Sequence, residues 1–208
     1  MDEYLLKLKG KISETIEGME VDDILNTKKQ LKKLGYYQEP KWGITHVADN
    51  AMFEGISKFQ KDNGLKVDRI MKPGGETETA INNLLKKKQS NVVSQISGAL
   101  SDLYRNYQDM KIDNTIGNDD YFHCKANYDA PQRGKWGEKT AKYIGDAKER
   151  FDYLKNRIRG IPPFDAYVDY LHDKDINAQG RQQAKNSLYE TSKTGCLYKR
   201  VRGINDKY

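Results

Sequence analysis

The sequence has few of the residues that would assign the protein directly to a functional class. Among 208 residues there are two cysteines, three histidines and five prolines, and there is no Cys-x-x-Cys pair. So few thiols and imidazoles, without ligand spacing, argue against a zinc site, and we expect neither a metal nor a cofactor. No apolar run approaches the roughly 18 residues needed to cross a bilayer, so we expect no membrane span.

Two further signals are missing. The first residues lack the basic-then-apolar order of a secretory signal peptide, so another route would have to carry the protein to a periplasm or cell wall. A stripe of single-sign charge is also missing, because 36 basic residues are interspersed with 30 acidic ones for a net charge of +6. We therefore expect no nucleic-acid partner, whereas a basic balance suits an anionic cell wall.

What the chain does contain is apolar residues at helical spacing, with few strand patterns. This predicts a mainly α-helical protein with two helical domains. Residues 1–17 are expected to form an amphipathic helix. Three short helices are then predicted over 21–34, 50–62 and 77–85, with Gly35 as the stop of the first and Thr77 as the cap of the third.

In the second half of the chain, the sequence pattern predicts longer helices. A polar break is expected at 86–90, followed by a connector helix within 89–117 that carries one long apolar stripe. Further helices are predicted over 139–157, 166–171 and 177–189, with Pro162-Pro163 as a break. The predicted domains are therefore residues 18–88 and residues 118–208.

The first domain contains motif elements in a characteristic order. They are Leu34-Gly35-Tyr36-Tyr37, Phe59-Gln60, Gly64-Leu65, Val67-Asp68 and Pro73-Gly74-Gly75-Glu76-Thr77. This order resembles the three-helix peptidoglycan-binding domain of many wall hydrolases. The resemblance implies peptidoglycan as the partner.

The loop after the first helix of this domain carries three aromatic residues, Tyr36, Tyr37 and Trp42. Aromatic faces stack on sugar rings, so these three are the candidate peptidoglycan-binding residues. The alternative is that Tyr36 lies in the core and Tyr37 is an ordinary surface residue. The sequence departs from the family at Arg69, where glycine is usual, and a turn that needs positive φ would be strained there.

The second domain opens with Asp120-Tyr121-Phe122-His123-Cys124-Lys125-Ala126-Asn127. This segment, with looser matches as far as Cys196, resembles C-terminal modules of Rhs-repeat and other polymorphic toxins. The resemblance implies a secreted antibacterial effector, delivered by contact-dependent or type VI secretion. A cognate immunity protein and a secretion-machinery component would then be its partners. The resemblance implies no particular chemistry.

We favour a lysozyme-like glycosidase among the chemistries that these residues allow. A glycosidase needs one protonated carboxyl and usually a second carboxylate. Glu138, at the start of a predicted helix, can form such a pair with Asp119 or Asp120, and His123 lies in the same segment. The alternative for Glu138 is a first-turn carboxylate favoured by the helix dipole.

A Cys–His amidase is the second chemistry. It would need Cys124 as a thiolate, with His172 or His46 as its base. A disulfide between Cys124 and Cys196, which we favour, would exclude this chemistry. The leading hypothesis is a cell-wall hydrolase that acts in the periplasm or at the wall. The alternatives are a phage endolysin, a non-catalytic wall-binding or adaptor protein, and a toxin with a different target.

Overall fold

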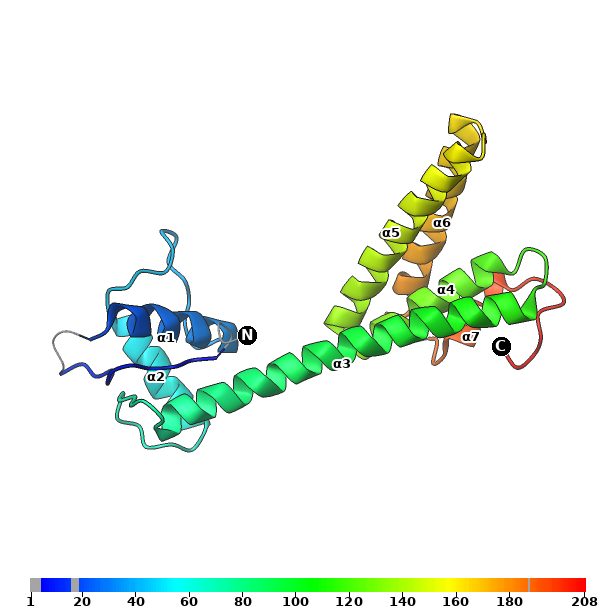
Figure 1. The fold of residues 1–208 in the computed structure, drawn as a ribbon. Helices are drawn as coiled ribbons and strands as arrows, with labels where there is room; N and C mark the ends of the chain where they lie inside the picture. Colours follow the sequence, from blue (N-terminus) through cyan, green and yellow to red (C-terminus); the bar gives the residue numbers. More distant parts are fainter. Residues whose placement is uncertain (1–4, 16–18, 187) are drawn as a thin grey trace. The chain divides into compact units, whose positions relative to one another are not determined.

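The computed structural model describes residues 5–15, 19–186 and 188–208 (Figure 1). Its helices are α1 (Val21–Leu34), α2 (Asn50–Asp62), α3 (Glu76–Asp113), α4 (Asp119–Asp129), η1 (Ala130–Arg133), α5 (Lys135–Ile158), α6 (Pro163–Gln183), α7 (Ser192–Gly195) and η2 (Leu197–Lys199), where η marks a 3-10 helix. Apart from one isolated bridge, the regular structure of these residues is helical, which confirms the mainly α class. None of the described helices could span a membrane.

The chain divides into two compact units, Met1–Asn91 and Val92–Tyr208. In the first unit, α1 and α2 lie where the sequence predicts them. Gly35 ends α1 at φ 86°, and the Tyr36 N–H donates to the Leu31 carbonyl at 2.8 Å. This is the left-handed stop that glycine allows without a steric penalty. Asp49 caps α2 by accepting a hydrogen bond from the Met52 N–H at 2.8 Å.

The predicted N-terminal helix is wrong over residues 5–15, which are extended or turn; its remaining residues lie outside the described part. Leu6 and Leu8 are buried and the lysines between and after them are exposed, which is the period-two pattern of a strand. The Leu8 N–H donates to Glu78 Oε1 of α3 at 2.7 Å, and Ile12 pairs with Met71 in an antiparallel bridge. Tertiary partners thus hold this segment extended.

The core of the first unit combines this segment with the three helices. Its buried members are Leu6, Leu8, Ile12, Ile24, Leu31, Tyr37, Met52, Phe53, Ile56, Phe59, Met71, Ile81 and Leu85. The core reaches the start of α3, so the first two and a half turns of that helix complete the small domain.

The predicted break at 86–90 and the Thr77 cap are both wrong, because α3 begins at Glu76 and continues to Asp113. Lysine and glutamine are good helix formers, and the segment 86–90 contains neither glycine nor proline. Nothing local therefore ends the helix. The division between the units falls inside α3, after Asn91.

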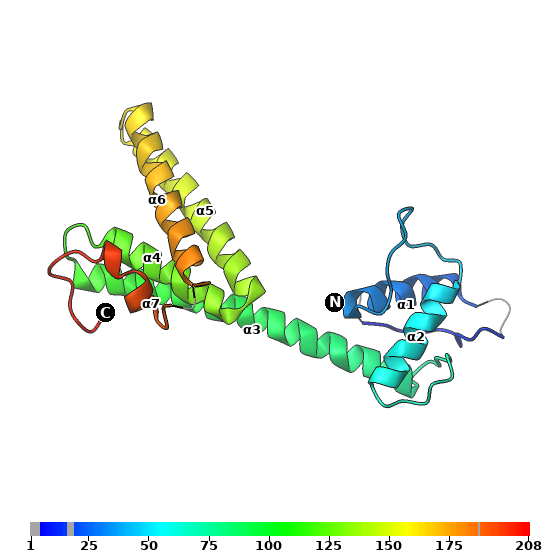
Figure 2. The ribbon, with the colours of Figure 1, turned by 180° about the vertical axis from the view of Figure 1, so that it is seen from behind.

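In the second unit, α5 and α6 lie side by side and α7 lies against α4 in both ribbon views (Figures 1 and 2). The Pro162-Pro163 break is confirmed, with Pro163 as the first residue of α6. The two helices predicted over 166–171 and 177–189 are one helix that ends at Gln183, because no helix breaker separates them. The core consists of Tyr121, Phe122, Cys124, Tyr128, Ile176, Cys196, Ile204 and Tyr208.

Candidate functional site

The loop between α1 and α2 is the candidate wall-binding surface of the first unit. Lys28 of α1 is fully buried and donates to the Val47 carbonyl at 2.6 Å and to Asp49. The Tyr37 hydroxyl donates to Asp49 Oδ2 at 3.3 Å. Both ends of the loop are therefore anchored to α1 and to the cap of α2.

The three predicted aromatic residues have different environments on this loop. Tyr37 is only 5% exposed and belongs to the core, and Tyr36 is partly buried with its ring edge-on to Phe59 at 5.2 Å. The expectation that both rings present free faces is wrong. Trp42 is 80% exposed and Val47 is also exposed. Trp42 is therefore the aromatic residue of this loop that is free to stack on a ligand.

Arg69 lies at φ 57°, the left-handed region that the family's glycine would occupy without strain. Its N–H donates to Gln60 Oε1 at 3.0 Å, and its guanidinium pairs with Glu14 at 2.8 Å. The turn is thus kept despite the substitution. The strain expected at Arg69 is present in the backbone.

In the second unit, one face of α5 carries a row of small residues that ends in a carboxylate. Gly137, Ala141, Gly145 and Glu149 are buried and recur every four residues. Small side chains let neighbouring helices approach closely, and α6 likewise has a glycine, Gly180, where it packs against α4. A Cβ at Gly180 would lie 2.4 Å from the Cys124 carbonyl oxygen of α4. This close packing brings polar groups of α4, α5 and α6 together.

A chain of amide hydrogen bonds links these three helices. The Asn127 side chain donates to Asn177 Oδ1 at 2.6 Å, and the Asn177 side chain donates to Glu149 Oε1 at 3.1 Å. Arg181 donates to Asn127 Oδ1 at 2.7 Å. Buried polar groups need such partners, so the network fixes the position of the Glu149 carboxylate.

Glu149 lies beside two further ionisable groups. His123 Nδ1 of α4 is 3.8 Å from Glu149 Oε1, and the Asp173 carboxyl of α6 hydrogen-bonds to Glu149. The Glu149 side chain is 1% exposed and that of His123 is 14% exposed. Lys148 donates to Glu149 at 3.3 Å and to Asp152 at 2.8 Å. We call His123, Glu149 and Asp173 the triad; Glu149 is buried and the other two are partly buried.

Burial and neighbouring charge shift the pKa values of Asp173 and His123 in opposite directions. Burial, together with the hydrogen bond and the negative charge of Glu149, raises the pKa of Asp173 to about 6. Burial lowers the pKa of His123, and the positive charge of Lys148 adds to this. Perturbed groups that lie together beside a cavity are typical of functional sites.

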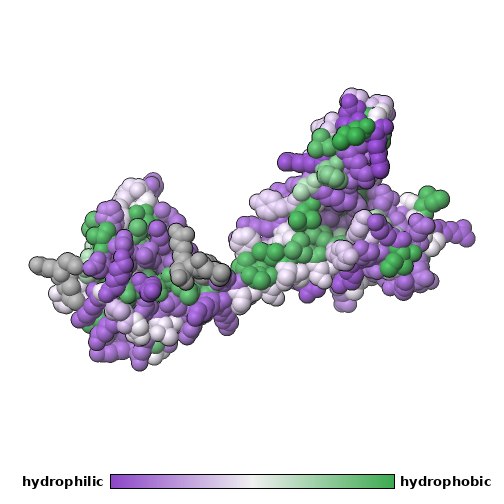
Figure 3. Space-filling view, viewed as in Figure 1, coloured by the Kyte–Doolittle hydropathy of each residue, from purple (hydrophilic) through white to green (hydrophobic). Residues whose placement is uncertain are grey.

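A cavity of about 740 Å³ adjoins the triad. The polar part of its lining consists of Asn106, Lys111, His123, Asn127, Lys148, Glu149, Asp152, Lys155 and Asn177. The other lining residues are mainly apolar and include Leu100, Leu103, Tyr104, Tyr107, Met110, Phe122, Ile144 and Phe151. Figure 3 shows apolar side chains gathered on this surface of α3 and α5. An apolar cavity with a few convergent polar groups is the usual form of a ligand site.

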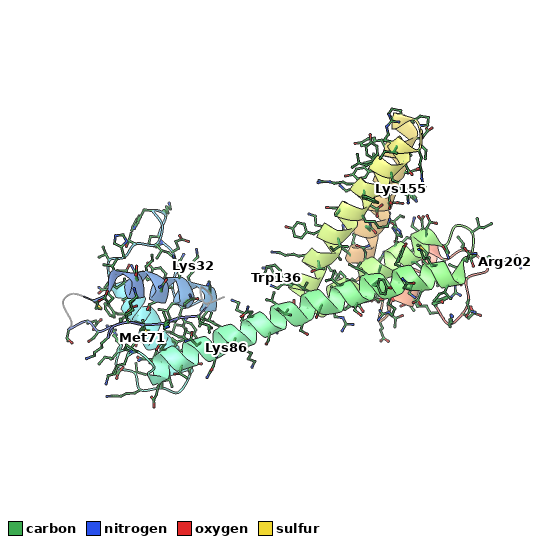
Figure 4. All side chains as sticks on the ribbon, viewed as in Figure 1. Lys32, Met71, Lys86, Trp136, Lys155 and Arg202 are labelled. Carbon is green, nitrogen blue, oxygen red and sulfur yellow. A yellow bond between two sulfur atoms is a disulfide. The ribbon has the colours of Figure 1, made fainter. Side chains whose placement is uncertain are left out.

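The structure does not bring the predicted catalytic residues together. Glu138 pairs with Lys185 at 2.6 Å and lies 11 residues before Glu149, roughly 16 Å along α5. Figure 4 labels Trp136 at the same end of α5 and Lys155 toward the opposite end. Asp120 instead contacts His172 at 3.0 Å and Lys199 at 3.7 Å. Of the predicted residues, His123 belongs to the triad.

Sequence reasoning missed Glu149 and Asp173. A signal was present for Glu149, because a carboxylate continues a row of glycine and alanine at intervals of four, where an exposed helix face would show no such row. Asp173 has no comparable signal. It lies on a face of α6 that only the packing of α4 and α5 defines.

The disulfide prediction is confirmed. Cys124 and Cys196 are joined with an S–S distance of 2.07 Å, which links α4 to the end of α7. A disulfide sulfur cannot act as a thiolate nucleophile. The Cys–His amidase is therefore excluded for the oxidised protein.

Comparison with known proteins assigns both halves of the chain. Residues 20–81 match the family described as putative peptidoglycan binding domain, and residues 89–208 match the family described as serum amyloid A protein. Serum amyloid A protein of Equus caballus is 48% identical over 107 residues, which are 51% of this chain and 88% of the relative. Serum amyloid A-2 protein of Neovison vison is 53% identical over 107 residues, which are 51% of this chain and 75% of the relative. Serum amyloid A-1 protein of Mus musculus is 34% identical over 107 residues, 51% of this chain and 73% of the relative.

These matches confirm one expected resemblance and correct the other. The peptidoglycan-binding domain is present in the first unit. The segment Asp120 to Asn127 belongs to the serum amyloid A match, so the resemblance to Rhs and polymorphic-toxin modules is wrong. An eight-residue motif with loose flanking matches was too short to identify the family of a whole domain.

Proposed function

The chain belongs to the serum amyloid A family, and from this premise we propose that it is a peptidoglycan-recognition protein without wall-degrading activity. Its peptidoglycan-binding domain would bring the serum amyloid A domain to bacterial cell walls. The exposure of Trp42 on a doubly anchored loop of that domain carries the proposal. A free aromatic face on a rigid loop loses little conformational entropy when it stacks on a sugar ring.

We propose that this recognition takes place outside cells. A disulfide such as Cys124–Cys196 persists in oxidising compartments, and the relatives' name places them in serum. Secretion machinery and an immunity protein were expected from the toxin resemblance alone. That resemblance is wrong, so we do not propose these partners, and the endolysin alternative gains no support from the matches.

Cell-wall hydrolysis is the second candidate, and the triad beside the cavity is the observation that favours it. A retaining glycosidase places its two carboxyls about 5–5.5 Å apart and an inverting one places them farther apart. Glu149 and Asp173 are in hydrogen-bonding contact, which is too close for either arrangement. Glu138 pairs with Lys185 in a partly exposed position, so it lacks the apolar surroundings of a general acid. The geometry therefore favours binding over glycosidic cleavage.

The test is sedimentation of the full chain with purified sacculi at moderate salt, followed by mass spectrometry of the soluble fraction. We expect the wild type to sediment and Trp42→Ala to lose at least tenfold in affinity. Trp136→Ala, at the chain's other tryptophan, is the matched control and should bind as the wild type does. Wild-type protein that stays in the supernatant would refute the binding proposal. Soluble fragments with new reducing ends would establish the hydrolase instead.

A further inference from the structure

The triad places three potential metal ligands, one imidazole and two carboxylates, from three helices at one point. One ring nitrogen of His123 and one carboxylate oxygen each of Glu149 and Asp173 lie within 4.8 Å of one another. Two ligand atoms that each lie about 2.1 Å from a cation are at most roughly 4.2 Å apart. The distance of 3.8 Å between His123 Nδ1 and Glu149 Oε1 meets this limit as it stands. A small rotation of the Asp173 side chain would bring in the third ligand.

The His123 ring gives an independent indication. It is mostly buried, and among the described residues it has no hydrogen-bond partner, since Glu149 at 3.8 Å is beyond hydrogen-bonding distance. A ring nitrogen that makes no hydrogen bond to the protein is free to bind an ion or a water. A ring nitrogen that faces two carboxylates matches the first of these.

The charges around the triad also favour a bound cation. Two carboxyl groups meet at Glu149 and Asp173, and the nearest cation, Lys148, is shared with Asp152. A divalent cation would neutralise both carboxylates while Lys148 kept its bond to Asp152. The Asn177 amide already holds Glu149 Oε1, as groups around metal ligands commonly do.

We propose that His123, Glu149 and Asp173 bind one divalent cation of the Zn²⁺ class. One imidazole and two carboxylates in a partly buried, three-ligand arrangement suit zinc and its neighbours, whereas Ca²⁺ takes six to eight oxygen ligands. His123 and Glu149 also line the cavity, so a water can enter and complete the coordination. Short sequence motifs do not reveal this site, because its three ligands are 26 and 24 residues apart in the sequence.

The test is isothermal titration of the full, disulfide-intact and metal-free chain with ZnSO4. We expect one ion per chain and a rise in Tm, with no comparable rise from Mg²⁺ or Ca²⁺. Asp173→Asn and His123→Gln should each weaken Zn²⁺ binding at least 30-fold. Glu149→Gln should also weaken Zn²⁺ binding at least 30-fold. It replaces His123→Gln as the test if circular dichroism shows that His123→Gln does not fold.

The control variants separate this site from exposed histidines. Asp120, His172 and Asp173 form a neighbouring group of donors, with His172 exposed. His172→Gln and His46→Gln should keep the wild-type stoichiometry and an affinity within about twofold. The proposal is wrong if the wild type binds no Zn²⁺ at millimolar concentration, if Asp173→Asn binds as tightly as the wild type, or if His172→Gln alone removes binding. None of these outcomes bears on sacculus binding, which tests the first unit.

Discussion

Each unit of the molecule contains a buried ionic group, and the two groups are built on opposite principles. In the first unit, Lys28 and Asp49 form a pair of opposite charges that holds a loop. In the second unit, Glu149 and Asp173 bring like charges together beside His123. In the first arrangement, each charge compensates part of the cost of burying the other. The second costs stability, and groups of that kind are retained mainly where they act on a ligand.

The pKa values reflect this contrast. Burial alone would raise the pKa of Asp49, but hydrogen bonds from Lys28 and from the Met52 N–H lower it overall. Asp173 has no such donor, and its pKa rises to about 6. The units also differ in their covalent links, because the described cysteines form one disulfide within the second unit.

Removal of the disulfide should have the largest effect and should be confined to the second unit. Cys124→Ala with Cys196→Ala opens a link between residues 72 positions apart, which by the chain-entropy model lowers the free energy of unfolding by about 4 kcal/mol. Amide hydrogen exchange of α4 and α6 should rise by orders of magnitude, while that of α1 and α2 stays unchanged. Equal protection in the double variant and the wild type would contradict this prediction.

Lys28→Met should have the next largest effect and should be confined to the first unit. Removing one partner of a buried pair leaves Asp49 uncompensated, which costs about 3 kcal/mol even though Asp49 is partly exposed. The matched control is Lys32→Met, since Lys32 lies one turn later in α1 and pairs with Glu39 at the surface. It should change stability by less than about 0.5 kcal/mol in urea denaturation. Similar losses in the two variants would mean that burial of the pair is unimportant.

Asp173→Asn should stabilise the metal-free protein at pH 7, by about 1 kcal/mol after allowance for solvent screening. The folded-state pKa of Asp173, about 6, lies above the ordinary value of 3.8, so its ionisation destabilises the folded state. This cost is complete above pH 6 and disappears as the pH falls below 4. The gain from Asp173→Asn should follow the same course in denaturation curves measured between pH 4 and 7.

His123 provides an internal check on that result. Its folded-state pKa is lowered, so the stability linked to neutral His123 is present above pH 6.5 and is lost as the pH falls from there. In the wild type this loss opposes the gain from Asp173, so the two effects partly offset each other as the pH falls from 6.5 to 4. The variant Asp173→Asn should lose stability over the same range. Asp169→Asn, one turn earlier on α6 and exposed, should behave like the wild type.

Arg69→Gly should have the smallest effect. Relief of the positive φ at residue 69 outweighs the loss of the exposed pair with Glu14, for a net gain of about 0.5 kcal/mol. Arg69→Ala loses the same ion pair without relieving the backbone, so it should be slightly less stable than the wild type. If both variants change Tm in the same direction, the backbone strain at this turn is negligible.

The sequence predicted local structure well where the signal lay within one or two turns of helix. The bounds of α1 and α2, the left-handed Gly35 and the strain at Arg69 all depend on residues close in the chain. Helix caps and turn conformations are decided at that range. The peptidoglycan-binding resemblance rested on such turns in a fixed order, and it is confirmed.

The Cys124–Cys196 pairing was also within reach of the sequence, because two cysteines allow one pairing. Tertiary structure alone decided that Leu6 and Leu8 lie in an extended segment, that Tyr37 is buried, and that Glu149 and Asp173 join His123. These outcomes depend on which helix faces pack together, and a helical period shows that a face exists but not what covers it. The close approach of α4, α5 and α6 through glycine and alanine supplies that missing information.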